Sequence, residues 1–304
     1  MSRKKHPLAT KVKYYYEEHY KKLLLIPMIL LVLSLGQIGY QFATTGTIFH
    51  QDVSLKGGVT LSVQAEDFDL DSIRNALDDE GYDYDIRQVK SAGRISGFII
   101  QADVPVDDTD SINALQAKVG NVLGMELDDD NSSIETVGST LGSQFFFSTI
   151  KAILIAFTFM GIVVFLYFRT LAPSFAVILA AFSDIVVTLA IINLFGVKIG
   201  TGGIAAFLMM IGYSVDTDIL LSVRVLKNKE GSTMDKVYSA LKTGLTMNIT
   251  TLVAVSIAYL FSGALVIQQI MLILFVGLLV DMINTWIQNV GILRWYLEKR
   301  PLKR

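Results

Sequence analysis

The chain contains no cysteine, which excludes disulfide bonds and thiolate metal sites. Histidine is nearly absent as well, because only His6, His19 and His50 are present and they are not neighbours in the sequence. This scarcity argues against a histidine metal site. We therefore expect no metal and no cofactor, and any folded domain must be held together by its hydrophobic core.

Apolar segments, in contrast, are long and numerous. Hydrophobic residues make up 52% of the 304 residues and the mean hydropathy is +0.50, which is too apolar for an ordinary soluble domain. Predominantly apolar runs of about 18 residues or more predict membrane-spanning helices. We predict six spans in a multi-pass membrane protein, at Leu23–Phe42, Phe146–Phe168, Ala172–Phe195, Gly203–Val225, Leu245–Phe261 and Val266–Trp295. The first contains Pro27 and Gln37 and lacks the small-residue exit of a signal peptide, so we expect an uncleaved anchor.

Charge is divided unevenly along the chain. The segment 43–145 holds nineteen acidic and six basic residues, so its net charge is −13, whereas the remainder has +11 and the whole chain −2. Basic residues retained in the cytoplasm set membrane orientation, and here they cluster before the first span, between the fourth and fifth, and after the last. We therefore expect a plasma-membrane protein with both termini in the cytoplasm. The predicted parts are a cytoplasmic segment, a first membrane helix, an acidic exterior domain, a five-helix membrane bundle and a cytoplasmic tail, at 1–22, 23–42, 43–145, 146–296 and 297–304.

The exterior domain shows strand and helix patterns in the order β-α-β-β-α-β, which predicts an α+β ferredoxin-like fold with helices on one face of an antiparallel sheet. A turn is expected at Gly93, and Asp69 or Asp71 is expected to cap the first helix. The strands are predicted at Val59–Val63, Tyr84–Val89, Gly97–Ala102 and Ser132–Val137, and the helices at Leu70–Leu77 and Thr109–Leu123. The domain lacks a phosphate loop, nucleophile elbow or metal spacing, so we expect a spacer or binding surface and not an enzyme. Its acidity fits solubility, adaptation to high salt, or a cationic ligand.

The base of this domain carries the segment DVSLKGG, which begins at Asp52. Gly57 and Gly58 follow a strand-like stretch there. Adjacent glycines permit positive φ and close backbone approach. The segment therefore predicts a tight turn at the domain base.

Four aspartates interrupt the apolar spans: Asp184, Asp216, Asp218 and Asp281. A charged side chain at the membrane centre costs at least about 2.5–3.5 kcal/mol, so each is expected to face protein or water. The basic ends of their helices place them roughly 10–20 Å from the cytoplasmic side. Three further polar residues belong to the same predicted layer: Thr188, Asn248 and Asn284.

Helical spacing sorts this layer into faces. Asp184 and Thr188 are four residues apart and share a face, whereas Asp216 and Asp218 point about 200° apart, so at most one of those two faces a given partner helix. The last span carries a polar stripe at i, i+3, i+4 and i+7, formed by Asp281, Asn284, Thr285 and Gln288. Carboxylates at one depth favour a proton relay built from the four aspartates, Asn248, Asn284 and Thr188. The alternative is structural glue between closely packed, glycine-rich helices.

The segment GYSVDTDILLSVRVLKNK at 212–229 resembles the fourth-span signature of the SecF family, a branch of the RND superfamily. DVSLKGG resembles the family's domain-base motif, and VGSTLG at 137–142 and SDIVVTL at 183–189 resemble its second-span and third-span motifs. The resemblance covers most of the chain. It implies a membrane subunit that pairs with SecD beside the SecY channel, within the membrane lipid, and assists late translocation or release of unfolded exported proteins, with no nucleic acid involved.

The aspartate pattern is similar to that of archaeal members. Asp216-Thr217-Asp218 stands where bacterial members usually have Asn-Asp-Thr, so the acids flank the usual position. The resemblance favours Asp184 first and Asp216 second as relay residues. A non-energised scaffold or binding module of the translocon and an independent RND-like half-transporter stay open as alternatives. An intramembrane aspartyl protease is disfavoured because no Gly-x-Gly-Asp element is present.

Overall fold

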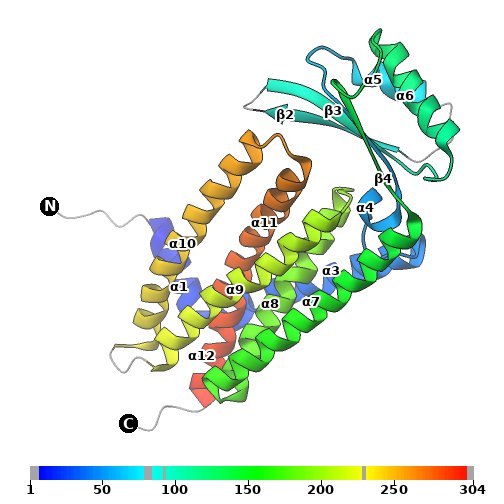
Figure 1. Cartoon of the computed structure of the whole chain (residues 1–304). Helices are drawn as coiled ribbons and strands as arrows, with labels where there is room; N and C mark the ends of the chain where they lie inside the picture. The colour runs from blue at the N-terminus through cyan, green and yellow to red at the C-terminus, as the bar shows by residue number, and fades with distance from the viewer. Residues whose placement is uncertain (1–6, 79–83, 92–93, 228–230, 300–304) are drawn as a thin grey trace.

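The structure is a computed structural model that describes residues 7–78, 84–91, 94–227 and 231–299. A helical bundle carries a small sheet domain at one end, and α1 (Pro7–Glu18) lies towards the other end (Figure 1). The predicted turn at Gly93, His6 and the basic residues at both extreme ends of the chain lie outside the described residues.

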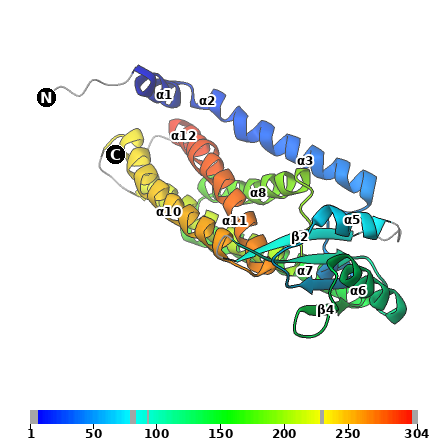
Figure 2. The ribbon, with the colours of Figure 1, turned by 90° about the horizontal axis from the view of Figure 1, so that it is seen from above.

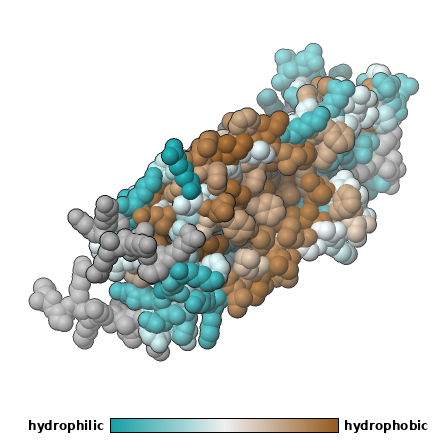
Figure 3. All heavy atoms as spheres, turned by 90° about the horizontal axis from the view of Figure 1, so that it is seen from below, coloured by the Kyte–Doolittle hydropathy of each residue, from teal (hydrophilic) through white to brown (hydrophobic). Residues whose placement is uncertain are grey.

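Six helices among the described residues are long and apolar enough to cross a membrane. Their residues are α2 and α3 (Tyr20–Leu23 and Leu25–Thr45), α7 (Ser139–Phe168), α8 (Leu171–Leu194), α9 (Thr201–Lys227), α10 (Thr233–Phe261), and the run α11 (Leu265–Ile283), η1 (Asn284–Asn289) and α12 (Val290–Lys299). Hydrophobic residues form a broad band over the bundle, with hydrophilic residues at both ends (Figure 3). The chain is therefore a multi-pass membrane protein, as the hydropathy predicts.

The two central helices are α8 and α9, which are buried over more than half of their apolar windows, whereas α7 is almost entirely exposed on the outside. The anchor helix α3 packs along α8, separate from α10 (Figure 2). Five of the six helices are longer than their predicted spans, and α10 and α7 begin seven or more residues earlier than predicted. α10 begins at Thr233, because Ser232 and Asp235 form a capping box there, and α7 begins at Ser139.

The sheet domain has the predicted ferredoxin-like order. Its strands are β1 (Gly58–Val63), β2 (Tyr84–Ser91), β3 (Arg94–Ala102) and β4 (Ser132–Val137), and they form a fully antiparallel sheet in the order β2-β3-β1-β4. The helices α5 (Leu70–Asp78) and α6 (Thr109–Leu123) pack against each other above this sheet (Figure 1). Inward residues of alternate strand positions, including Leu61, Phe98 and Ile100, form its core.

Two local predictions in this domain are corrected. The strand-like stretch after Asp52 is a short helix, α4 (Val53–Lys56), because the Asp52 carboxylate accepts from the Ser54 amide and caps it. The third strand begins at Arg94 and not at Gly97, because β3 pairs with β2 beyond a bulge. Asp69, and not Asp71, caps α5, since its carboxylate accepts from the backbone amides of Asp71 and Ser72.

The two glycines at the domain base take the predicted positive φ angles. Gly57 has φ 93° and Gly58 φ 126°. A Cβ atom on Gly57 would lie 2.6 Å from the Cα of Ser139, at the first residue of α7. Because these glycines have no side chains, the chain enters β1 in direct contact with α7, the helix that follows the sheet domain.

Candidate functional site: a buried carboxylate cluster

Three of the four aspartates are buried where α8, α9 and α11 meet. Asp184 comes from α8, Asp218 from α9 and Asp281 from the end of α11, and each is at most 1% exposed. Their helices contact one another pairwise. The bundle therefore brings carboxylates that are far apart in the sequence into one polar core.

Hydrogen bonds join two of these carboxylates through a single hydroxyl. Thr285 Oγ1 lies 2.9 Å from Asp218 Oδ1 and 3.1 Å from Asp281 Oδ1. One hydroxyl has one proton, so it donates to only one of the two oxygens at a time. The Asn248 amide donates to the other oxygen of Asp281 at 3.1 Å, and the Asn289 amide donates to Asp218 Oδ1 at 2.7 Å.

Asp184 accepts hydrogen bonds from two further side chains. The Asn284 amide donates to its Oδ1 at 2.7 Å, and the Ser214 hydroxyl donates to its Oδ2. The donors that the described residues place on all three carboxylates are thus neutral amides and hydroxyls. Such donors offset part of the desolvation of a carboxylate but leave its charge in place, so three negative charges together here are costly.

The polar stripe of the last span is confirmed as a buried face, but its backbone is not a regular α-helix. Asn284–Asn289 is a π-helix in which every residue except Ile287 is buried. In this wider turn two adjacent pairs of polar residues face the core: Asn284 and Thr285, and Gln288 and Asn289. π-Helical turns within α-helices are frequent at functional sites.

The two neighbouring aspartates of α9 are separated as their spacing predicts. Asp218 is 0% exposed and belongs to the cluster, whereas Asp216 lies on the exposed surface of α9. Asp216 therefore lies outside this cluster, because the side of α9 that faces α8 and α11 carries Asp218, and the relay role of Asp216 stays a prediction. Thr188 is buried beside the Met210 sulfur, 3.7 Å away, and within the described part of the chain its hydroxyl has no hydrogen bond to a carboxylate.

Three residues that form hydrogen bonds in or near this polar core were not predicted from the sequence. Asn289 follows Asp281 by eight residues, which is about 80° around a regular helix, so its position near the polar stripe was an available signal. Ser214 gave no signal, because an isolated serine in a span is common. Gln269 of α11 was also not predicted, and its side chain holds the start of α9 through the Gly200 and Gly203 amides and the Lys198 carbonyl.

The domain base is joined to the same end of α9. Ser54 Oγ accepts from the Thr201 amide at 3.0 Å and donates to Asp52 Oδ1 at 2.6 Å. The Asp52 amide donates to the Ile199 carbonyl at 3.1 Å. Asp52 therefore fastens the base of the sheet domain to the helix that carries Asp218.

Comparisons with known proteins agree on one family. The family model described as "Protein export membrane protein SecD/SecF, C-terminal" matches residues 119–299. Curated relatives named protein-export membrane protein SecF include one from Pyrococcus furiosus, 36% identical over 97% of each chain. Another, from Methanocaldococcus jannaschii, is 36% identical over 94% of this chain and 98% of its own.

A solved structure shows the same fold. The crystal structure of SecDF, a translocon-associated membrane protein from Thermus, superposes with a TM-score of 0.71 at 21% identity. The match covers 92% of this chain but only 38% of that SecDF chain. At this identity the likeness establishes the fold of the six-helix unit and its sheet domain.

Proposed function

The chain belongs to the SecF family of protein-export membrane proteins, and we propose on this basis that it is an accessory subunit of Sec protein export that pairs with a SecD-like subunit. Near full-length agreement with SecF relatives supports the family role. The solved SecDF chain is more than twice as long as the region matched here, so the complementary part is the natural partner. SecY, unfolded exported proteins and the surrounding lipid are the further proposed contacts, and catalysis is not proposed.

The exposed face of α9 supports a helical partner in the membrane. Asp216 is exposed there, and Gly212 has open space where a side chain would stand. A carboxylate facing lipid is costly, whereas a polar or small-residue face suits close packing against another helix. We propose that a SecD-like bundle covers this face.

We further propose that both termini are cytoplasmic and that 43–145 is exterior. The basic residues next to the N-terminus, the loop after α9 and the C-terminus support this orientation, because positive charge is retained on the cytoplasmic side. The sheet domain then offers its β4 edge, which is mostly exposed, to extended segments of exported proteins.

The carboxylate cluster is proposed as a proton-relay site, with Asp184, Asp218 and Asp281 as proton carriers. The observation that carries this proposal is the Thr285 hydroxyl between Asp218 and Asp281, in a cluster whose donors are neutral. Loading one proton relieves the repulsion between carboxylates, and a shift of α9 against α11 changes which oxygen receives it. Asn248 and Asn284 orient the acids.

Asp218→Asn tests the relay, because the amide keeps the side-chain volume and loses the titratable proton. We expect export that depends on the proton gradient to fall by at least about tenfold, with the SecD-like chain still copurifying in mild detergent. Asp216→Asn is the matched control, because Asp216 is two residues away and outside the cluster. We expect this variant to weaken copurification of the SecD-like chain more than it lowers gradient-dependent export. Normal gradient-dependent export by Asp218→Asn and Asp184→Asn, with lower thermal stability of the complex, would support the scaffold alternative instead.

A further inference from the structure

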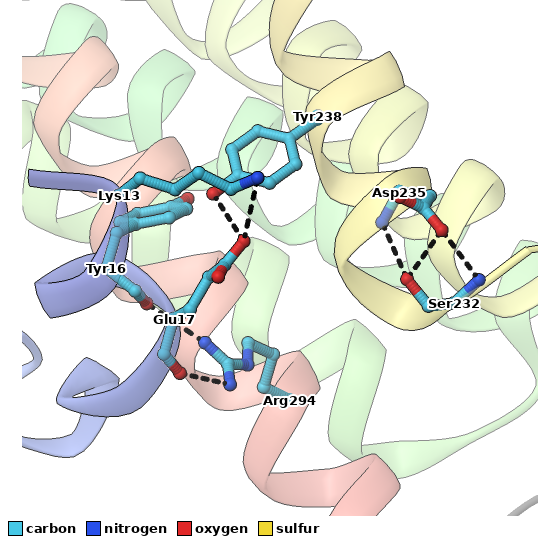
Figure 4. A network of polar contacts seen from close by, with 7 residues as sticks. All are labelled: Lys13, Tyr16, Glu17, Ser232, Asp235, Tyr238 and Arg294. Atoms are coloured by element: carbon cyan, nitrogen blue, oxygen red, sulfur yellow. Dashed lines mark hydrogen bonds and ion pairs between the residues drawn. The ribbon is translucent and has the colours of Figure 1, made fainter. Parts of the chain in front are cut away.

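A second polar network lies at the end of the bundle opposite the sheet domain (Figure 1), where α1 lies near α10 and α12 (Figure 4). Figure 4 shows Lys13, Tyr16 and Glu17 of α1 gathered around Tyr238 of α10 and Arg294 of α12. None of these side chains touches a cluster carboxylate. The network nevertheless reaches the π-helix by one hydrogen bond.

Arg294 fixes the end of α1. Its guanidinium donates to the Tyr16 carbonyl at 3.0 Å and to the Glu17 carbonyl at 2.8 Å. The last carbonyls of a helix lack intrahelical partners and carry partial negative charge, so a cation there caps the helix. Tyr238 adds a bond to the Glu17 carboxylate at 3.0 Å, and Lys13 pairs with the same oxygen at 3.7 Å.

Tyr16 carries the connection to the π-helix. Its hydroxyl donates to the backbone carbonyl of Trp286 at 2.7 Å, across 270 positions of sequence. Burial raises the pKa of Tyr16 well above its ordinary value, so the hydroxyl stays protonated and remains a donor at physiological pH.

Trp286 lies in the middle of the π-helix, whose side chains contact Asp218 of α9. The hydroxyl of its neighbour Thr285 and the amide of Asn289 both lie within hydrogen-bond distance of Asp218 Oδ1. The Trp286 ring packs where Gly244 of α10 leaves room, since a Cβ there would come within 2.3 Å of the ring. Backbone movement at Trp286 would consequently move the donors of the cluster.

We propose that Tyr16 is a positioning residue: held by the Arg294 cap on α1, its hydroxyl fixes the Trp286 carbonyl and with it the π-helical register that presents Thr285 and Asn289 to Asp218. The N-terminal helix α1 then has a structural role, because it holds a backbone irregularity that an isolated helix would tend to lose to the regular α-helix. The fixing of the π-helix by Tyr16 does not depend on proton transfer by the cluster. Its consequence for export rests on the proposed function.

Hydrogen exchange tests the fixing of the π-helix on the full chain in lipid nanodiscs. Tyr16→Phe keeps the ring and removes the hydroxyl, so we expect about two- to tenfold faster amide exchange confined to 284–290. Tyr15→Phe is the matched control, because Tyr15 is exposed and its ring contacts only Tyr14 and His19 among the described aromatic contacts. Arg294→Gln should reproduce the effect of Tyr16→Phe and also speed exchange at the end of α1. Unchanged exchange at 284–290, or a uniform increase along the bundle, overturns the proposal.

A double-mutant cycle tests the consequence for export. Tyr16→Phe should lower gradient-dependent export in the native background and have no additional effect in the Asp218→Asn background, because it acts through Asp218. Additive losses would contradict the proposed route. If Asp218→Asn alone exports normally, the relay fails, while the exchange experiment still decides whether Tyr16 holds the π-helix.

Discussion

At the scale of single residues, the surroundings of each aspartate decide what it does. In the sheet domain, Asp69 is an exposed helix cap and Asp108 a half-buried one, and they accept from the hydroxyls of Ser72 and Ser111, each at 2.6 Å. These side-chain bonds, with the backbone amides of the same turns, lower the pKa of both carboxyls because they favour the charged form. In the membrane bundle, the same residue type is enclosed by neutral amides and hydroxyls.

The caps predict an acid dependence for the sheet domain. A carboxyl with a lower pKa in the folded state stabilises it above the unfolded value of about 3.9, and this stabilisation is lost as the pH falls through the folded pKa. Asp69→Asn with Asp108→Asn retains good caps and should flatten the loss of thermal stability below about pH 4. Asp67→Asn, which removes a nearby exposed charge, should leave the pH profile unchanged. The measurement is thermal unfolding against pH, and identical profiles for the capping variant and the native chain would contradict the prediction.

At the scale of elements, short irregular segments connect the regular ones. The helix α4 and its two following glycines bring the base of the sheet onto α7, and the bonds of Asp52 and Ser54 hold the start of α9. The π-helix is a second irregular segment, inside the bundle, and its wider turn lets more polar side chains face the core. Both irregularities occur where two parts of the molecule must be held in register.

Gly57→Ala should therefore destabilise the domain base by about 2–4 kcal/mol, since it adds the cost of a positive φ to a clash with α7. Gly124→Ala is the matched control, because Gly124 has φ 67° and nothing within 4 Å of an added Cβ. The control carries only the backbone cost, about 1–2 kcal/mol. Thermal unfolding of the two variants measures the difference, and equal losses would show that the contact with Ser139 is not tight.

At the scale of the whole molecule, the sheet domain is inserted into the bundle through two adjacent strands. Gly58 and Val137, the first residue of β1 and the last of β4, are paired partners. Phe49 and Leu55, which precede the insertion, belong to the core of the membrane bundle. The bundle thus keeps its own packing up to Gly57, and the inserted domain begins immediately after it.

Deletion of 58–137, with Gly57 joined to Gly138, should consequently leave a folded bundle in the membrane. We expect nearly unchanged insertion and copurification of the proposed SecD-like partner, and impaired export because the proposed surface for exported segments is gone. A longer deletion from Thr44 also removes Phe49 and Asp52, and should destabilise the bundle. Protease protection and export assays compare the two, and normal export by the shorter deletion would contradict a binding role for the sheet domain.

Local patterns in the sequence determined the architecture of this protein. Hydropathy determined the six spans, the period of apolar residues determined the β-α-β-β-α-β order, and the spacing of Asp281, Asn284, Thr285 and Gln288 determined a buried polar face. These features follow from chemistry within one segment, because a span, a strand or a stripe is defined by residues a few positions apart.

Tertiary structure alone decided how these segments act together. Spacing showed that Asp216 and Asp218 point apart, but only the packing of α9 on α8 and α11 chose Asp218 for the cluster. The π-helix and the bond from Tyr16 to Trp286 depend on residues far away in the sequence, so no local period predicts them. The physical reason is that burial and hydrogen-bond partners are set by the neighbouring helix, whose identity a single segment does not contain.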